Sequence, residues 1–312
     1  MIRKLRTYHM TTDDISKYGF KPIDGPMRLM NTEEVTNPKE ADAFICPLPL
    51  REHTPPVMPY DLPRRIIEDF GIDERRFVAF DCSDDEWSDH GNSPLAMYVR
   101  CNLKPWMRKE MPRSIPWFWP VENYKECMPL PEQGFTYDVS GHMWISGGTR
   151  KEACESCLRT SGLKNDIEMY KNFTGYVYHL PEGIEKRKKF RTSMQHSRLS
   201  LCPKSIQFVF PYRYYEAMSA ARVPVLICDG CQFPFADKIP YQEFSLIIPE
   251  SEILHTGTVI QQFLATHNDE QLIEMGKKAR HYWELYLNRD NQSDLWTMAI
   301  TEKLMQDGLF SE

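Results

Sequence analysis

The sequence predicts an α/β protein built from two doubly wound, Rossmann-like domains that face a cleft. Short apolar segments recur between helix-like stretches in both halves of the chain. Such segments are typical of buried strands in a parallel sheet, and strands that alternate with helices are joined by right-handed crossovers. A length of 312 residues also suits two domains of ordinary size.

Each expected element has a local signal in the sequence. In the first half, residues 41–46 and 76–80 are expected strands, and residues 62–70 form an expected helix that Gly71 ends. The second half contains further expected strands at 135–139, 175–179, 199–202, 223–228 and 244–248, and helices at 150–160, 185–197 and 212–221. The stretch 107–133 is too rich in proline to form a long helix, so we place the domain boundary near residue 135.

Composition excludes several classes of protein. The net charge of −6 argues against nucleic-acid binding over the whole surface, although a local basic groove stays open. The apolar runs are too short for a membrane span, and no signal-peptide pattern follows the basic first residues. We therefore expect a cytoplasmic protein whose nine cysteines are reduced thiols.

The chemistry concentrates in residues 197–249. Pro211 suits the first turn of a helix, and Arg213 and Glu216 then lie on one face near the N-terminus of that helix. A guanidinium and a helix N-terminus favour phosphates, and a carboxylate accepts hydrogen bonds from ribose hydroxyls. Lys204 and Ser205 add a charge and a hydroxyl in the preceding loop. The alternative is an ordinary ion pair on a solvated helix face.

The same segment resembles the C-terminal signature of exostosin-like glycosyltransferases, family 47. The matching positions are Ser197, Leu201-Cys202-Pro203, Tyr212-Arg213, Glu216-Ala217, Pro224-Val225, Asp229, Pro234-Phe235 and Phe244-Ser245. Weaker matches are Asn37–Phe44 with Pro47, and Tyr137–Gly141 followed by Arg150. The family usually has glycine where Ser205 and Ala221 stand, and Ala221 disfavours a left-handed helix cap.

The resemblance implies a GT-B fold and an inverting transfer of a sugar from a nucleotide diphosphate sugar, with a UDP-sugar favoured, to a glycan hydroxyl. It also implies that no metal or other cofactor is needed. In this interpretation Arg213 neutralises the diphosphate, Glu216 holds the ribose and Arg150 is a further diphosphate ligand. The remaining expected donor-binding residues are Lys204, Ser205, Tyr212 and Asp229.

The GT-B fold also implies a separate role for each domain. Residues 1–135, joined by a C-terminal helix at about 285–312, would bind the acceptor, and residues 136–284 would bind the nucleotide sugar. The catalytic base should come from the first domain. The acidic loop after residues 77–80 offers Asp84, with Asp81 next, and His90 and His142 are alternatives.

Three other interpretations stay open. The acidic loop could be the manganese-binding motif of a GT-A transferase. The chain could be a catalytically silent module that binds a nucleotide sugar. It could also be a transferase that glycosylates modified DNA bases, in which case acceptor binding would depend steeply on salt.

Overall fold

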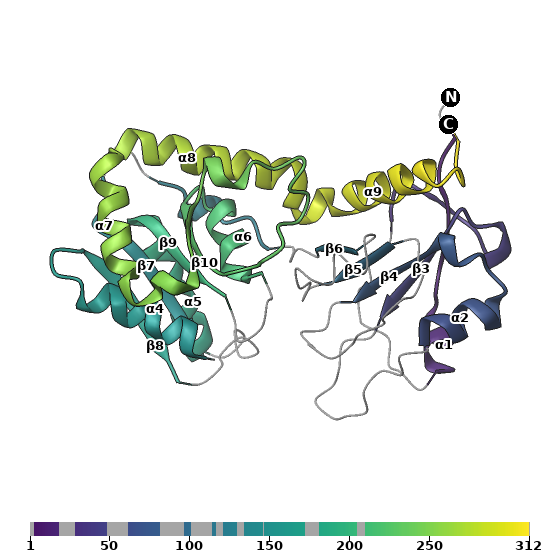
Figure 1. The fold of residues 1–312 in the computed structure, drawn as a ribbon, viewed down its shortest axis with the longest axis horizontal. Coiled ribbons are helices and arrows are strands. Elements are labelled where there is room, and N and C mark those ends of the chain that lie inside the picture. Colours follow the sequence, from purple (N-terminus) through teal and green to yellow (C-terminus); the bar gives the residue numbers. More distant parts are fainter. Residues whose placement is uncertain are drawn as a thin grey trace. The chain divides into compact units, whose positions relative to one another are not determined.

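Two parallel β-sheets organise the chain, one in each of two units (Figure 1). The first unit comprises Met1–Phe118 and Asp290–Glu312, and the second comprises Trp119–Arg289. The structure is a computed structural model. It describes residues 3–18, 29–48, 62–81, 97–100, 114–116, 121–129, 134–145, 147–171, 181–204 and 210–311. The expected pair of α/β domains of the GT-B type is confirmed, and the expected cleft stays a prediction.

The first unit forms a parallel sheet whose described strands follow the order β2-β1-β3-β4-β5-β6. These strands are β1 (Arg6–His9), β2 (Glu33–Glu34), β3 (Ala43–Leu48), β4 (Phe77–Asp81), β5 (Met97–Arg100) and β6 (Ser114–Pro116). The helical elements described in this unit are α1 (Thr12–Ser16), η1 (Pro38–Glu40), α2 (Leu62–Phe70), η2 (Glu74–Arg76) and α9 (Gln292–Gln306).

Aromatic side chains form the core of the first unit. Phe44 of β3 stacks on Phe77 of β4, with ring centroids 5.4 Å apart, and Phe80 meets the ring of Trp296 edge-on at 5.6 Å. Trp296 lies on α9, so the last helix of the chain completes a core that begins with the first strands. The two ends of the chain lie close together (Figure 1), and the Arg3 guanidinium carbon is 5.1 Å from the centroid of the Phe310 ring.

The second unit forms a parallel sheet in the order β11-β10-β9-β7-β8. Its strands are β7 (Tyr137–Trp144), β8 (Asn165–Tyr170), β9 (Ser197–Pro203), β10 (Val223–Ile227) and β11 (Leu246–Ile248). Its α-helices are α4 (Gly148–Arg159), α5 (Pro181–Gln195), α6 (Tyr212–Ser219), α7 (Thr256–Thr266) and α8 (Asp269–Tyr282). Shorter helical turns are η3 (Lys125–Cys127), η5 (Tyr241–Glu243), η6 (Glu250–His255), η7 (Trp283–Leu287) and η8 (Arg289–Asn291), the last at the junction with the first unit.

Both faces of this second sheet are covered, which explains its continuous apolar strands. On one face, Val139 and Leu199 pack with Cys154 of α4 and Ile260 of α7. Helices α5 and α6 pack against β7, β9 and β10. They cover the opposite face of the sheet, because successive residues of a strand point to opposite faces. Within the described parts of the chain, no helix has the length and apolar character needed to cross a membrane.

The boundaries differ in detail from the expected ones. The structure divides after residue 118, whereas the sequence placed a boundary near residue 135, so residues 119–135 group with the second unit. The return of the chain to the first unit begins at residue 290. The strand expected at 175–179 lies outside the described residues, and β8 is a strand that the sequence analysis missed.

The cap of α6 also differs from expectation. Ala221 adopts a left-handed backbone conformation with φ of +54°, although the side chain of alanine disfavours this conformation. The Arg222 N–H donates to the Ala217 carbonyl over 2.9 Å, which closes the cap. Such a conformation costs an alanine about 1 kcal/mol, and the packing of the flanking buried residues offsets this.

Candidate active site

The carboxyl edge of the second sheet gathers several residues that the sequence analysis selected. Arg150 lies in the first turn of α4, which follows β7, while Lys204 follows β9 and Asp229 follows β10. Because these strands are parallel, all three residues emerge at the same edge of the sheet. Ligands of doubly wound sheets bind at this edge, so these residues are positioned to meet one.

Lys204, Asp229 and Glu250 connect the ends of three neighbouring strands at this edge. The Lys204 Nζ atom lies 2.5 Å from Glu250 Oε1, and the Asp229 backbone N–H donates to the same oxygen over 2.8 Å. The Glu250 N–H donates in return to Asp229 Oδ1 over 3.1 Å. Because Glu250 already neutralises the lysine, this group is better suited to the hydroxyls of a sugar than to a diphosphate.

Sequence analysis missed Glu250, although a signal for it exists. The residue comes two positions after β11 ends at Ile248, which is the kind of place where Asp81 and Asp229 were noticed. Its side chain is 27% exposed, so a ligand at the edge of the sheet can reach it. Glu250 therefore joins Asp229 as an acceptor of hydrogen bonds at this edge.

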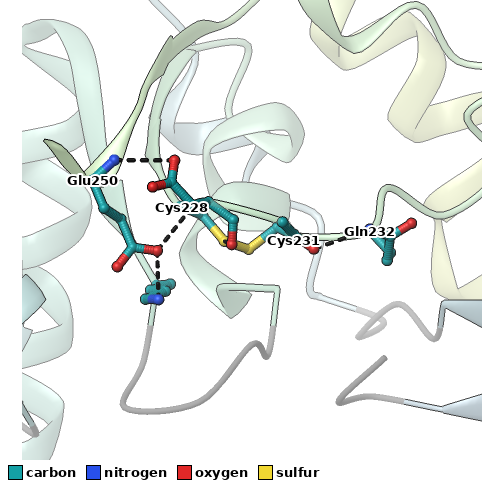
Figure 2. Close-up of a disulfide and its surroundings, with 7 residues drawn as sticks. Cys228, Cys231, Gln232 and Glu250 are labelled. Atoms are coloured by element: carbon teal, nitrogen blue, oxygen red, sulfur yellow. Dashed lines mark hydrogen bonds and ion pairs between the residues drawn. A yellow bond between two sulfur atoms is a disulfide. The ribbon is translucent and has the colours of Figure 1, made fainter. Parts of the chain in front are cut away.

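A disulfide closes the loop that carries Asp229. Cys228 and Cys231 are bonded to each other, and Figure 2 shows them beside Glu250. Between them, Gly230 takes a φ of +73°, a conformation that glycine adopts without steric cost. The expectation that the cysteines are reduced thiols is wrong for this pair, because the tight turn brings the two side chains within bonding distance.

The disulfide is expected to stabilise the second unit. Replacing both Cys228 and Cys231 with serine should lower the free energy of unfolding by about 2 kcal/mol, since the bond restricts a short loop in the unfolded chain. Denaturant unfolding of the variant and of the wild type measures this loss. In the wild type, unfolded without reductant, both cysteines should resist alkylation, and they should react after reduction. Alkylation of both residues before reduction would contradict the bond.

Arg213 lies at the start of α6 with a defined packing partner. Its guanidinium carbon lies 4.0 Å from the centroid of the Phe190 ring on α5, a cation–π contact. Its Nη1 atom is 3.5 Å from Glu216 Oε2, and the side chain is 24% exposed. The arginine is thus held in place by an aromatic ring while part of its cationic surface stays open to a ligand.

Glu216 is the most deeply buried carboxylate among the expected site residues whose side chains the structure describes. Its side chain is 7% exposed, and its Oε1 atom accepts a hydrogen bond of 2.6 Å from the Tyr124 hydroxyl. Burial raises the pKa of Glu216, while Arg213 and the Tyr124 hydroxyl act in the opposite direction. Arg213 and Glu216 are therefore held by each other and by two aromatic side chains from other elements: Phe190 contacts Arg213, and Tyr124 contacts Glu216.

Other expected site residues fall outside the described part of the chain. These are Ser205, Asp84 and His90. Asp81 is the last residue of β4, and its side chain lies outside the described set as well. The roles given to these residues stay predictions.

Tyr212 and His142 have contrasting surroundings. Tyr212 begins α6 and is 43% exposed, which suits contact with a ligand. His142 of β7 is buried, with Nε2 3.3 Å from Asp166 Oδ1 and Nδ1 3.5 Å from Glu168 Oε2. Burial lowers the pKa of His142, against the two carboxylates. It is enclosed by its neighbours, which argues against its alternative role as the base.

Comparison with known proteins places this site within a recognised domain. The exostosin GT47 domain family matches residues 149–263. A probable glycosyltransferase of Arabidopsis thaliana is 30% identical over 96 residues, which are 31% of this chain and 16% of that protein. Exostosin-1 of Bos taurus is 25% identical over 121 residues, 39% of this chain and 15% of that protein. The chain thus aligns with only a small part of these relatives.

Among solved structures, a glycosyltransferase from Rickettsia africae superposes with a TM-score of 0.48 at 9% identity, covering 97% of this chain and 99% of that one. The matched domain, residues 149–263, contains Lys204, Asp229 and Glu250 as well as the Arg213–Glu216 helix. Sequence resemblance and the position of these residues therefore agree, because residues 149–263, which carry them, match the exostosin GT47 domain.

Proposed function

We propose that this enzyme transfers a sugar, with inversion, from a nucleotide diphosphate sugar to a hydroxyl of a glycan acceptor, with a UDP-sugar as the favoured donor. The observation that supports this most is the pair formed by Arg213 and Glu216. A partly exposed cation and a buried carboxylate lie side by side on α6, within the exostosin GT47 segment. They offer one ligand for a diphosphate and one for the adjoining ribose.

The remaining charges at the carboxyl edge fit the same donor. Arg150 in the first turn of α4 is a second diphosphate ligand in this proposal, and the exposed aromatic ring of Tyr212 is a surface on which the nucleotide base of the donor can stack. Asp229 and Glu250 would accept hydrogen bonds from sugar hydroxyls. Because two arginines serve the leaving diphosphate, we propose that the reaction needs no metal.

The chemical step follows from inversion. The acceptor oxygen attacks the anomeric carbon, and the bond from that carbon to the diphosphate oxygen breaks. The nucleoside diphosphate leaves with the electron pair, and Arg213 stabilises its negative charge. The acceptor proton passes to a carboxylate of the first unit, for which Asp84 is the first candidate and Asp81 the second.

A thermal-shift screen against nucleoside diphosphates and their sugars tests the donor class. A true donor at 100 times its dissociation constant should stabilise the protein by about 2.7 kcal/mol. We expect uridine compounds to give the largest shift, and product formation with a UDP-sugar and a glycan should follow. No shift with any uridine, guanosine or adenosine compound would contradict the proposal, and binding without turnover would indicate a silent module.

A further inference from the structure

Tyr124 is fixed to α6 by its backbone. Its N–H donates to Ser219 Oγ over 2.9 Å, and the same Ser219 hydroxyl donates to the Glu122 carbonyl over 2.8 Å. Ser219 is fully buried on the last turn of α6. One hydroxyl thus attaches the segment around Tyr124 to the helix that carries Arg213 and Glu216.

The ring of Tyr124 is fixed as well. It meets the Phe190 ring edge-on, with centroids 6.4 Å apart, and the Arg191 guanidinium lies 4.9 Å from its centroid. Both partners belong to α5, and Tyr124 is 3% exposed. Because backbone and ring are both held, the hydroxyl has a defined position before any ligand arrives.

Because the Tyr124 hydroxyl binds one carboxylate oxygen of Glu216, the two oxygens of Glu216 have different partners. Oε1 accepts the 2.6 Å hydrogen bond from Tyr124, whereas Oε2 faces Arg213 at 3.5 Å, beyond a short ion-pair contact. We propose that Tyr124 is a positioning residue for the donor, which holds Oε1 so that Oε2 is presented to the ribose. This proposal rests on the proposed function.

The charged and titratable groups around Glu216 differ in how strongly they act on its ionisation. On α5, Arg187 and Arg191 both pair with Glu122, so much of their charge is already neutralised. Burial raises the pKa of Cys127 of η3 and of Cys202 of β9 to about 12, so both thiols stay neutral. Arg213 and the Tyr124 hydroxyl therefore favour the Glu216 carboxylate most, and Arg187 and Arg191 add smaller effects in the same direction.

The variant Tyr124→Phe removes the hydroxyl and keeps the ring. A hydrogen bond to a charged group is lost, so the pKa of Glu216 should rise and the Kd for UDP should increase about tenfold near neutral pH. In the wild type, UDP affinity should fall as the pH drops and Glu216 becomes protonated. In the variant, this fall should begin at a higher pH.

Two measurements on the whole chain test this. Carboxyl NMR of glutamate-labelled protein without ligand follows Glu216, assigned by its loss in Glu216→Gln. Calorimetry gives the Kd for UDP from about pH 5 to about pH 8, and the ionisation of UDP itself is common to all variants. Tyr8→Phe is the matched control, because it removes a tyrosine hydroxyl that donates to Asp14 over 2.8 Å in the other unit.

The outcomes separate the two proposals. A raised pKa of Glu216 together with a shifted pH profile in Tyr124→Phe, and neither in Tyr8→Phe, supports the positioning role. If the wild type binds UDP and the pKa and profile of Tyr124→Phe match it, the role of Tyr124 is overturned while the donor site stands. If the wild type binds no nucleoside diphosphate, both proposals fail together.

Discussion

Replacing Arg213 with alanine is expected to lower kcat/KM for sugar transfer by about 10³-fold, the size of effect seen when one preorganised donor to a developing negative charge is removed. The leaving diphosphate gains charge as the glycosidic bond breaks, and this arginine is held against Phe190 with its centre 4.0 Å from the ring. Arg213→Lys keeps the charge without the planar guanidinium, so it should recover only part of the loss. Steady-state kinetics with UDP-sugar measures each variant.

A loss of activity in Arg213→Ala has a structural explanation that must be separated from the catalytic one. Removing the arginine leaves the buried Glu216 carboxylate with less compensation, which destabilises the fold. The double variant Arg213→Ala with Glu216→Gln removes that unpaired charge, so its thermal stability should return towards that of Glu216→Gln alone, while its activity should be far below that of Glu216→Gln. Equal activity of the double variant and Glu216→Gln would show that Arg213 serves folding alone.

Local patterns were enough to predict the framework that positions these residues. The apolar run that forms β10 is buried at every position, and such a run is recognisable without tertiary information. The three-residue spacing of Arg213 and Glu216 sets both on one helix face. That face lies at the carboxyl edge of the second sheet because α6 follows the parallel strand β9. The motif in the sequence therefore also predicted where the two residues lie in the fold.

Contacts between distant segments could not be predicted in this way. Tyr124 reaches Glu216 across 92 positions of sequence, and no local pattern marks such a pair. Strand β8 was missed because its residues are mostly half-buried at the edge of the sheet, so it lacks the apolar run of a central strand. The left-handed Ala221 was missed because tertiary packing overrode a local preference.

Glu216→Gln should weaken UDP binding by about 100-fold and yet stabilise the protein. An amide cannot replace a carboxylate as the acceptor of two ribose hydroxyls, and each hydrogen bond to a charged group contributes strongly to affinity. The neutral amide, however, still accepts the hydrogen bond from Tyr124, and its burial does not carry the unfavourable desolvation free energy of a buried charge. We expect a gain of about 1 kcal/mol in the free energy of unfolding above neutral pH.

The pH dependence of that gain has a definite sign. Burial raises the pKa of Glu216 in the folded state, so its contribution to stability is fully present below the pKa of an unfolded glutamate and is lost as pH rises through the folded value. The free energies of unfolding of wild type and variant should therefore differ most at high pH and converge in acid.

Denaturant unfolding at several pH values tests this, with Glu243→Gln as the control. Glu243 is 55% exposed, so its replacement should change the free energy of unfolding by no more than about 0.5 kcal/mol. A Glu216→Gln protein that is less stable at high pH and still binds UDP tightly would instead make Glu216 a structural partner of Arg213 and Tyr124.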